Sequence, residues 1–329
     1  MHVGMSSLCY EHNDLKAAMQ HLLTSQSLGE LAGMPQNPYR WCAAMARIRE
    51  TQGDLDEALN LLDQAVRLYD ANFSPNVRPI ATRKVRVWVA QGRLGEALAW
   101  AHEHGLSVDN ELSYLHEFDH ITLARVLIAR YKTDRVESDL HAALALLARL
   151  LQAAEEGGRK GSAIEILVLK AIAYHALGDL PAALLLLQHA LKLAEPEGYI
   201  RMFLDEGSSM LQLLREAAAR EIMPTYTGKL LAAFEAEQRR SEDKSPLPPT
   251  QPLIEPEVRP AKDMLVEPLS QRELKILQLI AQGLSNREIG ERLFLALDTI
   301  KGHNRKIFDK LQVQSRTEAV ARARELGLL

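Results

Sequence analysis

Apolar residues recur along the first two hundred residues with a period near 40. Five positions open the same pattern: Leu follows directly, Ala stands four places on, and another apolar residue comes next. These positions are Asp14, Asp54, Arg93, Asp139 and Asp179, and the matching small residues are Ala18, Ala58, Ala97, Ala143 and Ala183. The spacings are 40, 39, 46 and 40 residues. A small residue at a fixed place lets a second helix approach closely, so the pattern predicts an α-solenoid of stacked helical hairpins.

Local signals agree with a solenoid of tetratricopeptide type with lengthened repeats. Gly53, Gly92 and Gly178 directly precede three of the five positions, where a tight turn needs a positive φ. Asp14 would open the second helix of a hairpin, but too few residues precede it for a full first helix. Large aromatic residues also lie in the array: Trp41, Trp88, Trp100, Tyr131 and Tyr174. We expect most of them to pack in the core, with a concave groove for an inducer or partner protein as the alternative.

A different pattern marks the last sixty residues. From Thr299 to Gln312, the apolar residues Ile300, Ile307 and Leu311 fall on one stripe of a helix. The other positions of this helix carry cationic or ionisable side chains: Lys301, His303, Arg305, Lys306 and Lys310. A helix with one apolar and one cationic face is either solvated or bound to a polyanion.

Three capping boxes in the neighbouring sequence favour the interpretation that this helix binds a polyanion. Ser270–Glu273, Ser285–Glu288 and Ser315–Glu318 each place a Glu three residues after a Ser, which is typical of a helix start. With the basic helix they predict four short helices joined by tight turns. Four such helices, the third of them basic, form the helix-turn-helix plan.

Proline separates the two regions. Seven of the 14 prolines lie between positions 246 and 268, with few apolar residues among them. We therefore expect residues 240–263 to be an extended, semi-stiff linker without helix or strand. The predicted organisation is a helical repeat domain at 1–239, this linker, and a DNA-binding domain at 264–329.

Charge divides in the same way. Residues 264–329 contain 11 Lys and Arg against 8 Asp and Glu, whereas the other residues contain 28 against 35. The cationic end is therefore the expected nucleic-acid end. Two Cys without a CxxC pair, and the lack of a long apolar run or signal-peptide pattern, indicate the reducing cytoplasm.

Two motifs suggest chemistry but lack its context. His116 to His120 has the HExxH spacing of zinc proteases, yet no third ligand is indicated, and the repeats place it on the first helix of a hairpin. No GxxxxGK[ST] phosphate loop occurs, and the nearest run, Gly157 to Ser162, has the wrong spacing. We therefore expect a polar solenoid surface at the first motif, a hairpin turn at the second, and no enzyme activity, metal or cofactor.

The C-terminal motifs resemble a known family. LSQREL, QGLSNREIGERL, TIKGH, KIFDKLQV and SRTEAVARARELGLL, within Leu269 to Leu329, resemble the LuxR-type helix-turn-helix domain without a gap. The resemblance implies a positioning helix at Glu288 to Leu293 and a recognition helix at Leu297 to Gln312. It also implies DNA-base contacts from Lys301, Gly302 and Arg305. The implied phosphate contacts are Asn286, Thr299, His303, Lys306, Lys310 and Arg316.

This sequence departs from the family at two positions. The family usually has Ser or Thr capping the recognition helix, where Ala296 stands, and this loss costs roughly 1 kcal/mol of helix stability. Gly302 replaces a common Val, so a methyl contact to thymine is lost. Both departures bear on which operator is read, and not on whether DNA is bound.

The repeat region resembles the tetratricopeptide-like sensor region of the MalT-like, large ATP-binding LuxR-type regulators. A GYIRMFLDEG signature of that family stands at Gly198 to Gly207. Members of the family carry an ATPase module upstream, so we expect this chain to be a fragment or a natural short form that lacks the nucleotide switch.

Together these features predict an all-α, DNA-binding transcriptional regulator of bacterial type. Expected partners are double-stranded DNA, a second copy of the chain bound to a paired half-site, RNA polymerase, and an inducer or partner protein on the repeats. The alternative is a non-enzymatic tetratricopeptide scaffold whose DNA-binding domain is vestigial. A two-component response regulator is a weaker alternative, because no alternating strand–helix receiver pattern precedes the DNA-binding domain.

Overall fold

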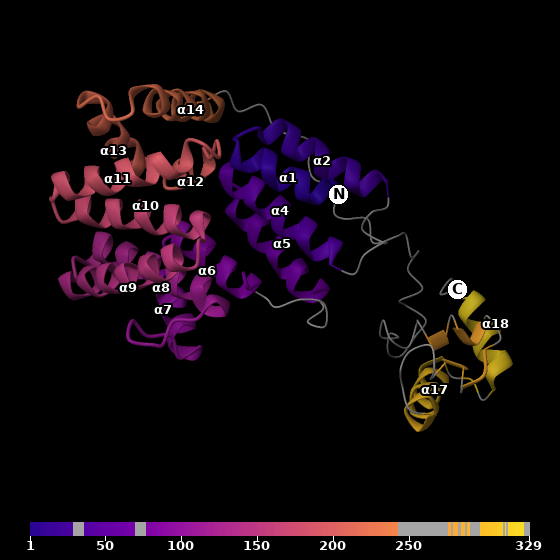
Figure 1. Ribbon diagram of the computed structural model, residues 1–329. Coiled ribbons are helices and arrows are strands. Elements are labelled where there is room, and N and C mark those ends of the chain that lie inside the picture. The colour runs from indigo at the N-terminus through magenta and orange to yellow at the C-terminus, as the bar shows by residue number, and fades with distance from the viewer. Residues whose placement is uncertain are drawn as a thin grey trace. The chain divides into compact units, whose positions relative to one another are not determined.

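The computed structural model describes residues 1–28, 36–69 and 77–242, and in the C-terminal part residues 276–277, 279–281, 284–286, 288–289, 297–311, 313 and 315–325. The chain divides into two compact units, Met1–Lys244 and Ser245–Leu329. Every regular element within the described ranges is a helix (Figure 1). The predicted all-α class is therefore confirmed.

The first unit consists of helical hairpins in sequence order. The five pairs are α1 (His2–Glu11) with α2 (Leu15–Ser27), α4 (Asn37–Thr51) with α5 (Leu55–Leu68), α6 (Ile80–Ala90) with α7 (Leu94–Glu103), α8 (Glu117–Asp134) with α9 (Glu137–Glu156), and α10 (Lys160–Ala176) with α11 (Leu180–Ala194). A 3₁₀ turn, η1 (Tyr114–His116), precedes α8, and α12 (Arg201–Leu204), α13 (Gly207–Ala219) and α14 (Pro224–Glu242) complete the unit. The first helices pack against one another between α1 and α4, between α6 and α8, and between α8 and α10, whereas the second and third pairs meet through α5 and α6. Such packing of neighbouring pairs is expected for a solenoid.

The repeated sequence positions start the second helix in four of the five pairs. Asp14, Asp54 and Asp179 each accept a hydrogen bond from the backbone N–H three residues on, at 2.9, 3.3 and 3.1 Å. Arg93 occupies the same place without a side-chain cap, whereas Asp139 lies inside α9. All five of the small residues are fully buried: Ala18, Ala58, Ala97, Ala143 and Ala183. Close approach of paired helices at these alanines is thus confirmed.

Two sequence expectations about the ends of this region were wrong. The first hairpin has a full first helix, because the turn between α1 and α2 takes only three residues and leaves ten for α1. The helix α14 runs to Glu242, so the first three residues of the expected linker are helical. Their sequence, Arg240-Ser241-Glu242, precedes the first proline of the linker and offers nothing that breaks a helix. Residues 243–263 lie outside the described residues.

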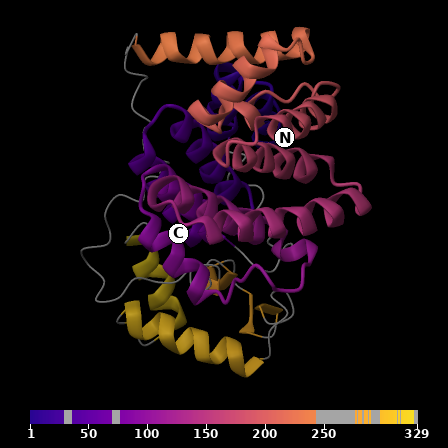
Figure 2. The ribbon, with the colours of Figure 1, turned by 90° about the vertical axis from the view of Figure 1, so that its left-hand side faces the viewer.

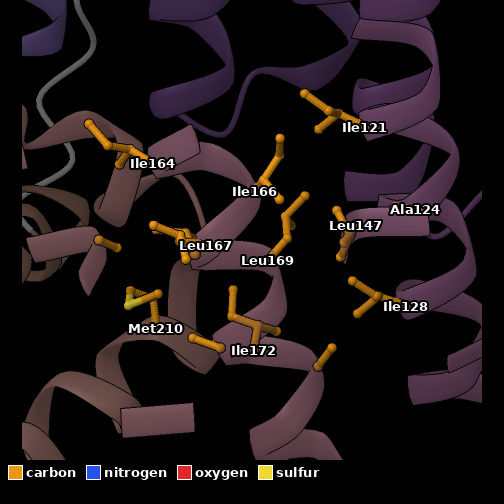
Figure 3. Close-up of a cluster of buried hydrophobic side chains, with 14 of the residues drawn as sticks. Ile121, Ala124, Ile128, Leu147, Ile164, Ile166, Leu167, Leu169, Ile172 and Met210 are labelled. Atoms are coloured by element: carbon orange, nitrogen blue, oxygen red, sulfur yellow. The ribbon is translucent and has the colours of Figure 1, made fainter. Parts of the chain in front are cut away.

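The core of the first unit is continuous from α6 to α14. In Figure 3, side chains of α8, α9 and α13 converge on apolar side chains of α10, including Leu167 and Ile172. Of the five large aromatic residues in the array, Trp41, Trp100 and Tyr131 are buried, and Trp88 and Tyr174 pack partly buried against the core. Their expected packing role is therefore confirmed.

The solenoid curls far enough for its two ends to meet. The backbone N–H of Ile200, just before α12, donates to the carbonyl of Glu11 in α1 at 2.8 Å. Beside it the Tyr10 hydroxyl donates to the Asp205 carboxylate at 3.1 Å, and Arg201 donates to Asn13 at 3.2 Å. Figures 1 and 2 both show the first hairpin, in indigo, beside the end of the array. We call this contact between α1 and residues 198–207 the closing contact.

The second unit contains a separate apolar core. Helices α17 (Leu297–Leu311) and α18 (Arg316–Glu325) pack together. Their buried residues join those of two preceding segments: Ile276, Leu277, Leu279, Ile280, Ile289, Ile300, Ile307, Leu311, Ala319 and Ala323. The predicted apolar stripe at Ile300, Ile307 and Leu311 is therefore confirmed.

Candidate functional site

The helix α17 has two chemically opposite faces. Ile300, Ile307 and Leu311 are buried in the core, while Arg305 and Lys306 are exposed. Burial of one stripe fixes the orientation of the helix, and the two cations consequently point into solvent. The predicted contact residues Thr299, Lys301, Gly302 and His303 also belong to α17. Their side chains, like Ala296 as a whole, lie outside the described residues.

A capping box starts the helical segment at residues 286–289, which precedes α17 in the chain. The Ser285 amide and hydroxyl both donate to the Glu288 carboxylate at 2.7 Å, and the Glu288 amide donates back to Ser285 Oγ at 3.3 Å. The hydrogen bond from the Ser285 hydroxyl and that from its amide lower the pKa of Glu288. The predicted box is thus confirmed. In the next one, the Glu318 amide donates to Ser315 Oγ at 3.2 Å; the box at Ser270 lies outside the described residues.

Three polar side chains tie this helix start to α17 and α18. Asn304 Nδ2 donates to Asn286 Oδ1 at 2.8 Å, and Arg316 Nη1 lies 3.4 Å from the same oxygen. The Arg316 guanidinium also donates to the carbonyls of Leu284 and Ile280. We call Asn286, Asn304 and Arg316 the polar junction. Since Asn286 and Arg316 are also expected to contact phosphate, the junction holds two predicted contact residues in place.

Sequence reasoning missed Asn304, which is only 8% exposed. A signal for it was present: Asn304 stands four residues after Ile300 and three before Ile307, within the apolar stripe. A polar residue at a stripe position requires a buried hydrogen-bond partner. Asn286 provides that partner.

Charged side chains also gather inside the curl of the solenoid. Arg86 on α6 pairs with Glu165 on α10 at 2.7 Å, although α8 lies between these helices in the array. Arg125 on α8 pairs with the same Glu165 at 3.0 Å and with Glu206 at 2.6 Å. Side chains from alternate repeats can meet only on the inner side of a curved array. We therefore call the surface lined by the first helices the inner face.

Burial and neighbouring charges shift the pKa values of ionisable groups on the inner face. Burial raises the pKa of Glu165, but the guanidinium groups of Arg86 and Arg125 outweigh it and hold that pKa well below its usual range. Burial raises the pKa of Glu50 on α4 to about 7, against the opposing influence of Arg83 and Arg47. Glu165 is consequently a fixed charge, whereas Glu50 titrates near neutrality.

The HExxH segment is occupied by structural contacts. Glu117 pairs with Arg159 at 2.7 Å and accepts a hydrogen bond from Ser162 at 2.5 Å. Asp119 accepts from Thr82 at 2.5 Å, and His120 Nδ1 lies 2.9 Å from the His116 carbonyl. Across the described part of the chain, no group of three or more His, Cys, Asp or Glu side chains is placed to hold a metal ion. The segment thus joins α8 to its neighbours.

Comparison with known families assigns both units. Residues 1–220 match the family model described as "MalT-like TPR region", which covers 220 of the 329 residues. The chain belongs to the MalT-like TPR family. Residues 267–323 match the family model of "Bacterial regulatory proteins, luxR family". The MalT-like chain is therefore a DNA-binding transcription regulator, with a helical repeat region followed by a LuxR-type helix-turn-helix domain.

The MalT-like repeat region places its GYIRMFLDEG segment at the closing contact. In this segment Ile200 bonds α1, Arg201 pairs with Asp205 and Glu237, and Glu206 pairs with Arg125. One short stretch thus joins the first hairpin, α14 and the inner face. No helix in the described ranges of the MalT-like chain is both long and apolar enough to cross a membrane.

Proposed function

We propose that α17 enters the major groove of DNA and that the helical repeat region receives the signal that controls this binding. The observation that carries the proposal is the exposed pair Arg305 and Lys306, opposite a buried stripe, within the segment that matches the luxR family. Cations held on a rigid helix suit a groove flanked by phosphates. The cationic C-terminal region and acidic repeat region agree with this division of labour.

The proposed roles divide between bases and phosphates. Lys301, Gly302 and Arg305 face base edges, with Arg305 suited to a bidentate contact with guanine. The proposed phosphate contacts are Asn286, Thr299, His303, Lys306, Lys310 and Arg316. Asn286 and Arg316 additionally hold the polar junction, so their substitution affects stability as well as DNA binding.

The proposal also covers the oligomeric state of the protein, its cellular location and its partners. A module of this size buries a small interface on one half-site, so we propose that two copies bind paired half-sites in the cytoplasm. RNA polymerase is the proposed downstream partner, and an inducer or partner protein binds the repeats. The domain limits 1–239, 240–263 and 264–329 fit this scheme, with the helical start of the linker corrected as above.

The experiment is a gel shift with operator fragments selected from genomic DNA by the purified full chain. Arg305→Ala is expected to reduce discrimination between operator and random DNA by about 1–3 kcal/mol, because a base contact is lost. Lys306→Ala is expected to weaken binding to all sequences alike and to reduce the slope of log affinity against log salt by about 1. The matched control is Arg215→Ala, which removes an exposed cation from α13 in the first unit.

The scaffold alternative predicts a different result. A vestigial DNA-binding domain gives weak binding without preference for any fragment, and neither Arg305→Ala nor Lys306→Ala changes it. That outcome would refute the proposed DNA contacts while leaving the fold intact. The signal is tested separately, by asking whether a ligand of the repeats changes operator affinity.

A further inference from the structure

Three guanidinium groups surround one aromatic ring on the inner face. The guanidinium carbon of Arg86 lies 3.9 Å from the centroid of the Phe118 ring, and those of Arg78 and Arg83 lie at 5.6 and 5.9 Å. Arg78 precedes α6, and Arg83 and Arg86 belong to it, whereas Phe118 comes from α8. We call these four residues the arginine cluster. Cation–π contacts favour each guanidinium near the ring, but three like charges at one ring repel one another.

Among the described residues, Arg86 is the one member of the three arginines with a carboxylate partner. Arg86 pairs with Glu165 at 2.7 Å and donates to Thr122 at 2.9 Å, although its Nη2 is buried without an acceptor. Arg78 and Arg83 have no carboxylate within 4.0 Å among the residues that the structure describes. The cluster therefore carries two positive charges in excess of its direct partners.

The pKa of Arg83 reflects this excess of positive charge. Burial, and then the charges of Arg47 and Arg78, lower the pKa of Arg83 to about 9, against the opposing charge of Glu50. Glu50 is a poor counter-charge, because its own pKa of about 7 leaves it partly protonated at neutral pH. A guanidinium remains charged in proteins, so such a site lowers its free energy by taking up an anion.

We propose that the arginine cluster binds a small dianion, a phosphate monoester or a dicarboxylate. Arg78 and Arg83 bind the anionic groups through their forked N–H donors. Arg86, which is fixed by its ion pair with Glu165, packs against the Phe118 ring beside them. Arg78 is exposed and Arg83 half-buried, so a ligand can reach both side chains. A small molecule is the proposed ligand, because the three guanidinium groups gather around a single aromatic ring.

This inference rests on the proposed function in one respect: the dianion is the signal that the repeat region receives. The binding itself depends only on the contacts described above. It can therefore be measured without DNA, and the two proposals can fail separately.

The test is calorimetric titration of the full chain, in phosphate-free buffer at constant ionic strength, with inorganic phosphate and with succinate. Succinamide serves as the uncharged probe. At least one dianion is expected to bind, with tenfold or greater weakening by Arg83→Gln and by Arg78→Gln, and succinamide is expected not to bind. Arg215→Gln, an exposed arginine of α13, is the matched control and should leave affinity unchanged.

The outcomes separate the ligand classes. Binding of phosphate alone assigns a phosphate monoester, binding of succinate alone assigns a dicarboxylate, and binding of both supports the wider dianion class. The inference is overturned if neither probe binds, or if both cluster variants bind as tightly as the unchanged chain. Should Arg83→Gln fail to fold, Arg83→Lys keeps the charge and is expected to show intermediate affinity, because a single ammonium replaces the fork.

A gel shift with the selected operator completes the design. If the dianion binds and changes operator affinity, both proposals stand. If it binds without changing operator affinity, the dianion site stands and its role as the signal fails. If operator binding persists while no dianion binds, the dianion site fails and the DNA-binding proposal stands.

Discussion

At the scale of single residues, buried polar groups hold the C-terminal unit in register. Asn304 takes a position in the apolar stripe of α17 and reaches Asn286 at 2.8 Å. Its amide stands where a Leu or Ile would bury more apolar surface. The hydrogen bond is directional, so it fixes α17 against the helix start at Asn286, whereas apolar packing alone would let the two segments slide.

Asn304→Ala is expected to lower the unfolding free energy of the C-terminal unit by about 1–3 kcal/mol, because Asn286 Oδ1 loses its shorter hydrogen bond. Amide hydrogen exchange along α17 measures this effect directly. The control is Lys306→Ala, an exposed position of the same helix, with an expected change within about 0.5 kcal/mol. Equal effects of the two substitutions would contradict the structural role of Asn304.

Glu50 makes the stability of the repeat region depend on pH. Burial raises its pKa from 4.5 to about 7 in the folded chain, with Arg83, Arg47, Asp205 and Arg86 as the charged groups that face it. The folded state therefore binds more protons than the unfolded state between these values. Consequently the contribution of Glu50 becomes less favourable as the pH rises from about 4.5 to about 7.

Glu50→Gln is expected to stabilise the repeat region at pH 8 by about 3 kcal/mol and to leave it almost unchanged at pH 4.5. Urea unfolding followed by tryptophan fluorescence measures this, because all three Trp lie in the repeats. Glu57→Gln, a substitution in α5 of the same hairpin, is the control, and its effect on the free energy of unfolding is measured at the same two pH values. A Glu50→Gln effect that does not vary with pH would contradict the raised pKa.

At the scale of elements, a capping box fixes the start of the helical segment at residues 286–289. Ser285→Ala removes two hydrogen bonds of the capping box and should lower the unfolding free energy of the C-terminal unit by about 1 kcal/mol. It should also raise the pKa of Glu288 towards its ordinary value, since the Ser285 hydroxyl is the main cause of the shift. An NMR titration of the Glu288 carboxyl distinguishes this from a merely looser helix. An unchanged Glu288 pKa would contradict the box.

Local patterns in the sequence predicted most elements. The Asp–Leu pairs and the alanines four residues on predicted the second helices, and the Ser–Glu spacing predicted the box at Ser285. The stripe of α17 and its exposed Arg305 and Lys306 followed from helical periodicity. In each case the interacting residues are close in sequence, so their spacing carries the information.

The remaining features depend on contacts between distant residues. The partner of Asn304 lies 18 residues away, and Tyr10 meets Asp205 across 195 residues. The arginine cluster forms because α6 and α8 present their side chains to one inner face. The spacing of residues along the chain does not predict these contacts, because they depend on the accumulated curvature of the whole array.

At the scale of the whole molecule, each unit folds around its own core, and the first unit closes on itself. In a solenoid, each repeat ordinarily contacts and stabilises only its neighbouring repeats. The closing contact adds a link between its first hairpin and α12, which makes the array more cooperative. Burial raises the pKa of the Tyr10 hydroxyl, and the nearby Asp205 charge raises it further, so Tyr10 stays a hydrogen-bond donor.

A double-mutant cycle on Tyr10→Phe and Asp205→Asn tests this link. Each single substitution is expected to destabilise the first unit by about 1–2 kcal/mol, and the double variant by about 1 kcal/mol less than their sum, because both remove the same hydrogen bond. Tyr131→Phe is the matched control: its hydroxyl is also on a buried Tyr but bonds Ala176 at 3.4 Å, far from Asp205. The destabilisation by Tyr131→Phe should add to that by Asp205→Asn, with no coupling energy between the two substitutions. If closure links the ends, both closing-contact variants should also speed hydrogen exchange in α1 and α12 together. Loss of protection in α1 alone, with α12 unchanged, would mean that the first hairpin frays independently and that the curl is maintained by neighbouring repeats.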